Sequence, residues 1–128
     1  MNELFEGVNW IAVIIGFVLS YLLGWLWYGP KLFGKTWAEG VGVSLVEGGE
    51  LPAGAMIAQA FATFGLAWLI GIAVGKAALF TILLILGTLM LFVVSSGKYA
   101  KKSNAAVVIE ASYMAAMGVV MVVCQGIF

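Results

Sequence analysis

Long uncharged hydrophobic runs separated by short polar stretches make up most of this chain. The runs cover residues 8–28, 53–75, 78–96 and 105–128, and Glu110 is the one charge inside any of them. A helix of about 20 residues reaches roughly the 30 Å of a hydrocarbon core. The pattern therefore predicts an all-α integral membrane protein, residues 1–128 forming a single transmembrane domain in which four transmembrane helices pack as a bundle.

A short amphipathic segment follows the first run. Gly29-Pro30 ends the first helix, because proline cannot continue it. Over residues 30–39, apolar Leu32, Phe33 and Trp37 share one helical face, and Lys31, Lys35 and Glu39 share the other. This pattern is typical of a helix lying flat on a membrane surface, so an interfacial helix is predicted here.

Aromatic residues gather where the first helix reaches that segment. Their rings prefer the headgroup layer, which favours membrane anchoring over a ligand site, the alternative. The predicted interface anchors are Trp25, Trp27, Tyr28, Lys31, Lys35 and Trp37.

The amino-acid composition excludes several classes of function. The chain is 64% hydrophobic and 9% charged, with six basic and six acidic residues, no histidine and one cysteine, Cys124. With as many acidic as basic residues, the chain lacks the basic patch that nucleic-acid binding needs. Without histidine, neither a typical zinc site nor an imidazole-based triad can form. We expect no enzyme activity, no cofactor, no resident metal and no nucleic-acid partner.

Lysines predict the orientation of the helices. Lys31, Lys35 and three lysines between residues 98 and 102 fall on one side, and Lys76 falls on the other. By the positive-inside rule, the side with five lysines is cytoplasmic and both termini lie outside.

The string WYGPKLFGKTW, residues 27–37, resembles the end of the first helix in an uncharacterised family of small bacterial membrane proteins, domain of unknown function 1761. Tyr113, Met117 and Gly118 are similar to that family's final span. The resemblance implies a four-helix protein of the bacterial inner membrane and brings no activity with it.

Glu110 is the strongest candidate for a functional residue. A carboxylate inside a span is costly unless it is paired, hydrated or protonated, so it is a functional candidate by default. It could exchange a proton or cation. Alternatively, it lies near the helix start, where it could pair with a lysine of the preceding loop or favour the helix N-terminus.

Sulfur and hydroxyl groups suggest a polar route through the bundle. Met114, Met117 and Met121 follow Glu110 on one helical face, a pattern that suits Cu(I) but is more typical of core packing. Thr81, Thr88 and Ser95 form a hydroxyl stripe that could equally bond to its own backbone. The candidate ion or substrate path comprises Glu110, Gln59, Thr63, Thr81, Thr88, Tyr113 and Met117.

Small residues repeat every four positions on two helices, which lets other backbones approach closely. These predicted packing faces are Gly16, Ser20 and Gly24 on the first helix and Ala67, Gly71 and Gly75 on the second. Two such faces in so short a chain favour a homo-oligomer.

Two functions fit these patterns. The first is a small oligomeric transporter or channel for an ion or small solute, with Glu110 in the membrane. The alternative is a non-catalytic membrane scaffold or a module that binds lipid or a partner. A hydrated route to Glu110 would favour the first, and a lysine cap on Glu110 the second.

Overall fold

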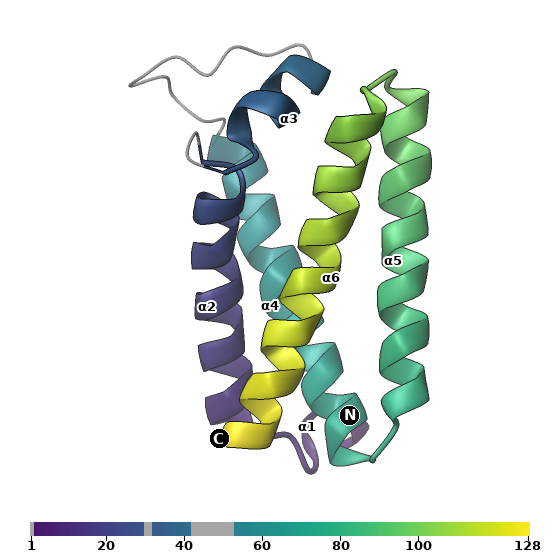
Figure 1. Cartoon of the computed structure of the whole chain (residues 1–128). Helices are drawn as coiled ribbons and strands as arrows, with labels where there is room; N and C mark the ends of the chain where they lie inside the picture. The colour runs from purple at the N-terminus through teal and green to yellow at the C-terminus, as the bar shows by residue number, and fades with distance from the viewer. Residues whose placement is uncertain (1, 30–31, 42–52) are drawn as a thin grey trace.

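The computed structural model describes residues 2–29, 32–41 and 53–128. Its helices are α1 (Asn2–Phe5), α2 (Trp10–Trp27), α3 (Gly34–Val41), α4 (Ala53–Gly75), α5 (Leu79–Tyr99) and α6 (Asn104–Ile127), arranged as shown in Figure 1. Lys31 and the start of the predicted interfacial segment 30–39 lie outside the described residues.

Four helices within these residues, α2, α4, α5 and α6, are long and apolar enough to cross a membrane. Their candidate spans contain 18 to 24 residues, which corresponds to helices about 27 to 36 Å long. That length matches a hydrocarbon core of roughly 30 Å. The chain is thus an all-α membrane protein with a bundle fold.

Side-chain caps fix where two of the spans begin. The Asn9 side chain accepts a hydrogen bond from the Ala12 amide at 3.2 Å, just before α2. The Ser103 hydroxyl oxygen accepts one from the Ala106 amide at 3.1 Å, just before α6. Each cap satisfies an amide that has no partner within its own helix, so the polar loops end at these residues.

The third span is longer than the 78–96 predicted from the hydrophobic run, because α5 continues to Tyr99. Gly97 does not end the helix but lets α6 approach it, since a Cβ built there would lie 2.7 Å from a Val107 methyl group. The chain reverses at Lys101, whose φ of 60° is left-handed. Lys98 therefore belongs to the last turn of α5 and not to the loop.

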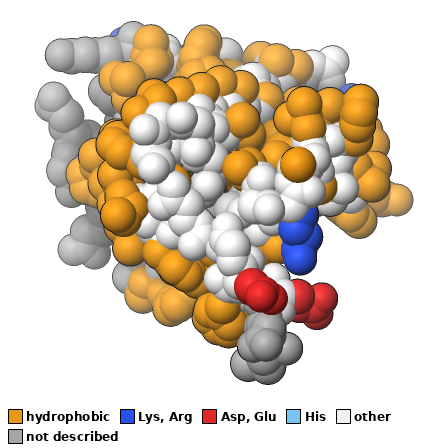
Figure 2. Space-filling model, turned by 90° about the horizontal axis from the view of Figure 1, so that it is seen from below, with side chains coloured by type: hydrophobic (Ala, Val, Ile, Leu, Met, Phe, Trp, Pro, Cys, Tyr) orange, Lys and Arg blue, Asp and Glu red, His pale blue; other side chains and the backbone are white. Residues whose placement is uncertain are grey.

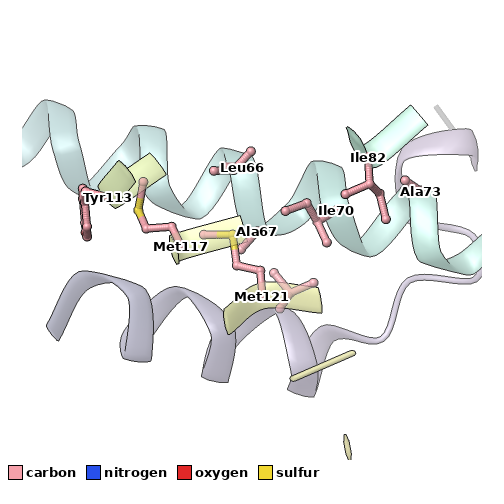
Figure 3. Close-up of a cluster of buried hydrophobic side chains, with 9 residues drawn as sticks. Leu66, Ala67, Ile70, Ala73, Ile82, Tyr113, Met117 and Met121 are labelled. Atoms are coloured by element: carbon pink, nitrogen blue, oxygen red, sulfur yellow. The ribbon is translucent and has the colours of Figure 1, made fainter. Parts of the chain in front are cut away.

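Helix α6 is the centre of the bundle. It packs against α2, α3, α4 and α5, whereas α5 contacts mainly α6 and lies at the edge of the molecule (Figure 1). The buried core lies between α2, α4 and α6, with Ile82 contributed by α5 (Figure 3). It contains Val13, Leu66, Ala67, Ile70, Ala73, Ile82, Tyr113, Met117 and Met121.

The small-residue faces are used inside this single chain. Gly16 lies against Met121, with 3.5 Å from a Cβ built there to the Met121 Cα. A Cβ on Gly24 would lie 2.6 Å from the Tyr113 hydroxyl oxygen, and one on Gly71 would lie 2.7 Å from a Val13 methyl group. Ser20 and Ala67 are also buried. A Cβ on Gly75 would lie 2.7 Å from the Gly7 carbonyl oxygen. These faces therefore supply no surface left over for a second copy.

Both ends of the chain lie at the same end of the bundle, and α3 lies at the other (Figure 1). Figure 2, seen from the end with the termini, shows hydrophobic side chains around most of the perimeter and charged ones gathered at one edge. A hydrophobic perimeter is what a protein surrounded by lipid requires.

Candidate functional site

Glu110 lies on α6, six residues after the helix begins at Asn104, or about 9 Å along the axis. Its carboxylate is bound by two donors from different elements. Lys102 Nζ lies 2.8 Å from Oε2 and 3.1 Å from Oε1. Trp37 Nε1 donates to Oε2 at 3.0 Å. We call Glu110, Lys102 and Trp37 the Glu110 cluster.

The Glu110–Lys102 ion pair is largely shielded. The two side chains are 16% and 27% exposed, and this is the one salt bridge found among the described residues. Partial burial strengthens such a pair and raises the cost of losing one partner. The tight turn at Lys101 sets up the pair, because it places Lys102 two helical turns before Glu110.

The Glu110 cluster also positions α3. Trp37 joins the middle of α3 to α6, and the Ser103 amide donates to the Gly40 carbonyl at 2.9 Å near the end of α3. A Cβ on Gly40 would collide with the Ser103 and Ala106 side chains. The segment predicted to lie on the membrane surface is therefore packed against the first turns of α6, with Lys35 exposed.

The aromatic residues near the end of α2 pack inward with one exception. The Tyr28 ring centroid lies 5.2 Å from that of Trp37 and 5.4 Å from that of Tyr113, both edge to face. Trp27 Nε1 donates to the Ile109 carbonyl at 3.1 Å. Trp25 is 64% exposed, as expected of an anchor in the headgroup layer. Trp27, Tyr28 and Trp37 thus join α2, α3 and α6.

A second polar group lies deeper in the bundle. The Tyr113 hydroxyl donates to the Ser20 carbonyl at 2.7 Å. The Thr63 hydroxyl donates to the Gln59 carbonyl at 2.6 Å, so it bonds to its own helix. The exposed Gln59 side chain donates to the Thr63 hydroxyl oxygen at 3.4 Å. The Ser20 hydroxyl is fully buried and has no hydrogen-bond partner among the described residues.

The seven path candidates are only partly brought together. Tyr113 lies one helical turn beyond Glu110 on the same face of α6, and Gln59 and Thr63 are bonded to each other on α4. Met117 is buried in the apolar core. Thr81 and Thr88 are exposed on α5 and face away from the bundle, as does Ser95. No group of three or more His, Cys, Asp or Glu side chains suited to a metal ion is found among the described residues.

Sequence patterns missed the contact that organises this site. Trp37 and Glu110 are 73 residues apart, and no spacing rule connects them. The lysine loop did suggest a partner for Glu110, but it left Lys98, Lys101 and Lys102 as alternatives. The structure shows that the partner is Lys102.

Comparisons with known proteins place the chain in a family. A family model described as "Protein of unknown function (DUF1761)" matches residues 11–126. Searches of curated proteins and of solved structures give no match. Since the matched region runs from the first turn of α2 almost to the end of α6, the chain belongs to the DUF1761 family of proteins of unknown function.

Proposed function

We propose that this protein is a non-catalytic membrane module that binds a partner, and that Glu110 maintains the shape of its α3 end. The observation that carries the proposal is the pairing of Glu110 with both Lys102 and Trp37. A carboxylate with two fixed donors from its own chain is suited to holding helices together.

The surroundings of Glu110 support binding over transport. A carboxylate that carries an ion needs a hydrated route on either side of it. Two shallow surface depressions formed by the described residues run along α5, and neither of these two is lined by Glu110, Gln59 or Thr63. The methionines on the Glu110 face lead into the apolar core instead.

The α3 end of the molecule offers a polar surface for a partner. Lys35, Thr36 and Glu39 are exposed on α3. Lys98 and Lys101 are exposed where α5 turns into α6. Since the Glu110 cluster fixes α3 against α6, it also fixes this surface.

Cation transport is the second candidate, and one observation favours it. The buried Ser20 hydroxyl has no hydrogen-bond partner within the described part of the chain, and the carbonyl of the same residue accepts from Tyr113, one turn from Glu110. An unpaired buried hydroxyl is costly and can mark a site for a passing ion or water. In this case Lys102 would be a tethered cation that the transported cation displaces.

The proposal includes the bacterial inner membrane as the location, with both termini outside. The five-to-one lysine bias supports that orientation. A homo-oligomer stays a prediction, and its contact would need a surface other than the two small-residue faces.

Reconstitution into vesicles tests binding against transport. Wild type, Glu110→Gln and Lys102→Gln are assayed for proton and cation flux and, separately, for thermal unfolding. We expect no flux from any of them and a lower unfolding temperature for both variants. Lys98→Gln is the matched control, because it removes the same charge without touching Glu110. Wild-type flux that Glu110→Gln abolishes without loss of stability would establish the transport candidate instead.

A further inference from the structure

The outer face of α5 carries a continuous groove. Two shallow depressions run along it and share Leu91 and Val94. The first depression adds Ser95, Lys98 and Tyr99. The second continues the same face past Thr88 and Gly87 to Leu83, with Ala111 of α6 at its side. These residues recur at the three- and four-residue spacings of one helical face. We call this surface the α5 groove.

The two ends of the α5 groove differ in chemistry. One end presents a lysine ammonium, a phenol and a hydroxyl, from Lys98, Tyr99 and Ser95. The rest is formed almost entirely by apolar side chains such as Leu83, Leu84 and Leu91. A polar head joined to an apolar tail would match both ends at once.

Among the described residues, no carboxylate forms an ion pair with Lys98 at the polar end. Lys98 Nζ donates to the Asn104 side-chain oxygen, a neutral acceptor, at 3.3 Å. Glu110, the one acidic residue of α6, is bound by Lys102. Lys101 is exposed two residues beyond the end of α5. Lys98 and Lys101 together favour an anionic partner.

The part of the α5 groove from Gly87 to Lys98 has the depth of one leaflet of a bilayer. From Gly87 to Lys98 is 11 residues of helix, or about 16 Å. Half of a hydrocarbon core is about 15 Å, so Lys98 reaches the headgroup layer while Gly87 stays at acyl depth. A Cβ built on Gly87 meets nothing within 4 Å, so the floor of the groove is open at that point.

We propose that the α5 groove seats one anionic phospholipid from the leaflet on the α3 side. The phosphate lies against Lys98, Ser95 and Tyr99, and an acyl chain follows the apolar face past Leu91 and Gly87. This inference rests on the proposed binding function and names the class of its partner. Charge complementarity at Lys98 and the apolar face beneath it select an anionic lipid over a zwitterionic one.

Native mass spectrometry of the purified protein titrated with phosphatidylglycerol or phosphatidylcholine tests the headgroup contact. We expect wild type to bind phosphatidylglycerol more tightly. Lys98→Gln should weaken phosphatidylglycerol binding about fivefold, the effect of losing one basic contact near a membrane surface, and leave phosphatidylcholine unchanged. Lys76→Gln is the matched control, because it removes a lysine at the opposite end of α5. Equal binding of the two lipids by wild type, or equal effects of the two lysine variants, would overturn the proposal.

A second pair of variants tests the tail contact. Gly87→Leu fills the open floor of the α5 groove and should reduce phosphatidylglycerol binding by about tenfold or more, on the scale of one lost apolar contact. Gly65→Leu on α4 is the control, because a Cβ there also meets nothing within 4 Å. A wild-type dimer that Gly87→Leu dissociates would overturn the proposal and assign the groove to a second copy.

Measuring lipid binding and ion flux on the same protein distinguishes failure of the lipid proposal from failure of the proposed binding function. Flux through wild type would end the proposed binding function while lipid selectivity at Lys98 could still be measured. Absent flux together with absent lipid selectivity would leave a binding module but remove the lipid from the α5 groove.

Discussion

Trp37 on α3 donates a hydrogen bond to Glu110 on α6, although the two residues are 73 positions apart in the chain. The bond links a short helix outside the spans to the one acidic side chain within the four candidate spans. It gives Glu110 a structural partner that is itself held by the Tyr28 ring. The segment predicted to lie on a membrane surface is therefore also used for packing against α6.

Trp37→Phe should destabilise the protein by about 1 to 3 kcal/mol, because the ring can still pack on Tyr28 while Glu110 loses a donor. Thermal unfolding in mild detergent measures the change. Trp25→Phe is the control and should shift stability by less than about 0.5 kcal/mol, since Trp25 is exposed. Equal effects of the two variants would mean that the Trp37 bond contributes nothing to stability.

Lys102 and Glu110 should be energetically coupled. A double-mutant cycle with Lys102→Gln and Glu110→Gln is expected to give a coupling of about 0.5 to 3 kcal/mol, because each single change leaves a partly buried charge without its partner. The same cycle with Lys98→Gln in place of Lys102→Gln should be additive within about 0.5 kcal/mol. Additivity in both cycles would show that the ion pair contributes no measurable coupling free energy.

Gly24→Ala should destabilise the bundle by about 1 to 3 kcal/mol, because the new methyl group would overlap the Tyr113 hydroxyl and displace it from the Ser20 carbonyl. Gly65→Ala should instead be neutral or stabilising by up to about 1 kcal/mol, since its Cβ meets open space within a helix. Comparing the unfolding midpoints of the two variants under the same conditions tests this difference in stability. A tolerated Gly24→Ala would mean that Tyr113 moves without cost.

Single cysteines should report opposite sides of the membrane. Glu3→Cys lies in α1 at the end with the termini, and Ala100→Cys lies in the turn after α5 at the other end. If the lysine bias sets orientation, an impermeant thiol reagent added outside intact cells labels Glu3→Cys and spares Ala100→Cys. Wild type controls for its own thiol, Cys124, which is buried. The reverse labelling would place the lysine-rich end outside.

The spans could be predicted from the sequence because hydropathy and charge act locally. Pro30 and the polar stretch around Lys101 interrupt uncharged runs of bilayer length, and no tertiary information is needed to find them. Gly24 and Gly71 likewise signalled close packing, since small residues allow it wherever they lie on a helix. Which helix fills each face is a tertiary property, so the sequence did not reveal that Tyr113 fills the space at Gly24.

The Glu110 cluster and the direction of the hydroxyl stripe required the structure. A seven-residue period places Thr81 and Thr88 on one face but does not say whether that face meets another helix or lipid. In the bundle it faces outward. Pairing of Glu110 with Lys102 depends on the left-handed turn at Lys101, a conformation that lysine's side chain does not encode.

The central place of α6 has a consequence for how the protein is made. Because α6 is translated after α2, α4 and α5, α2 and α4 can already pair through contacts such as Gly71 with Val13, but α5 enters the bilayer before its main partner exists. Until α6 arrives, the surface around Gly16 and Gly24 faces lipid, and the Trp27 indole lacks its Ile109 carbonyl. We expect α5 to remain loosely attached, exposed to membrane quality-control proteases, and to join the pair of α2 and α4 when α6 inserts.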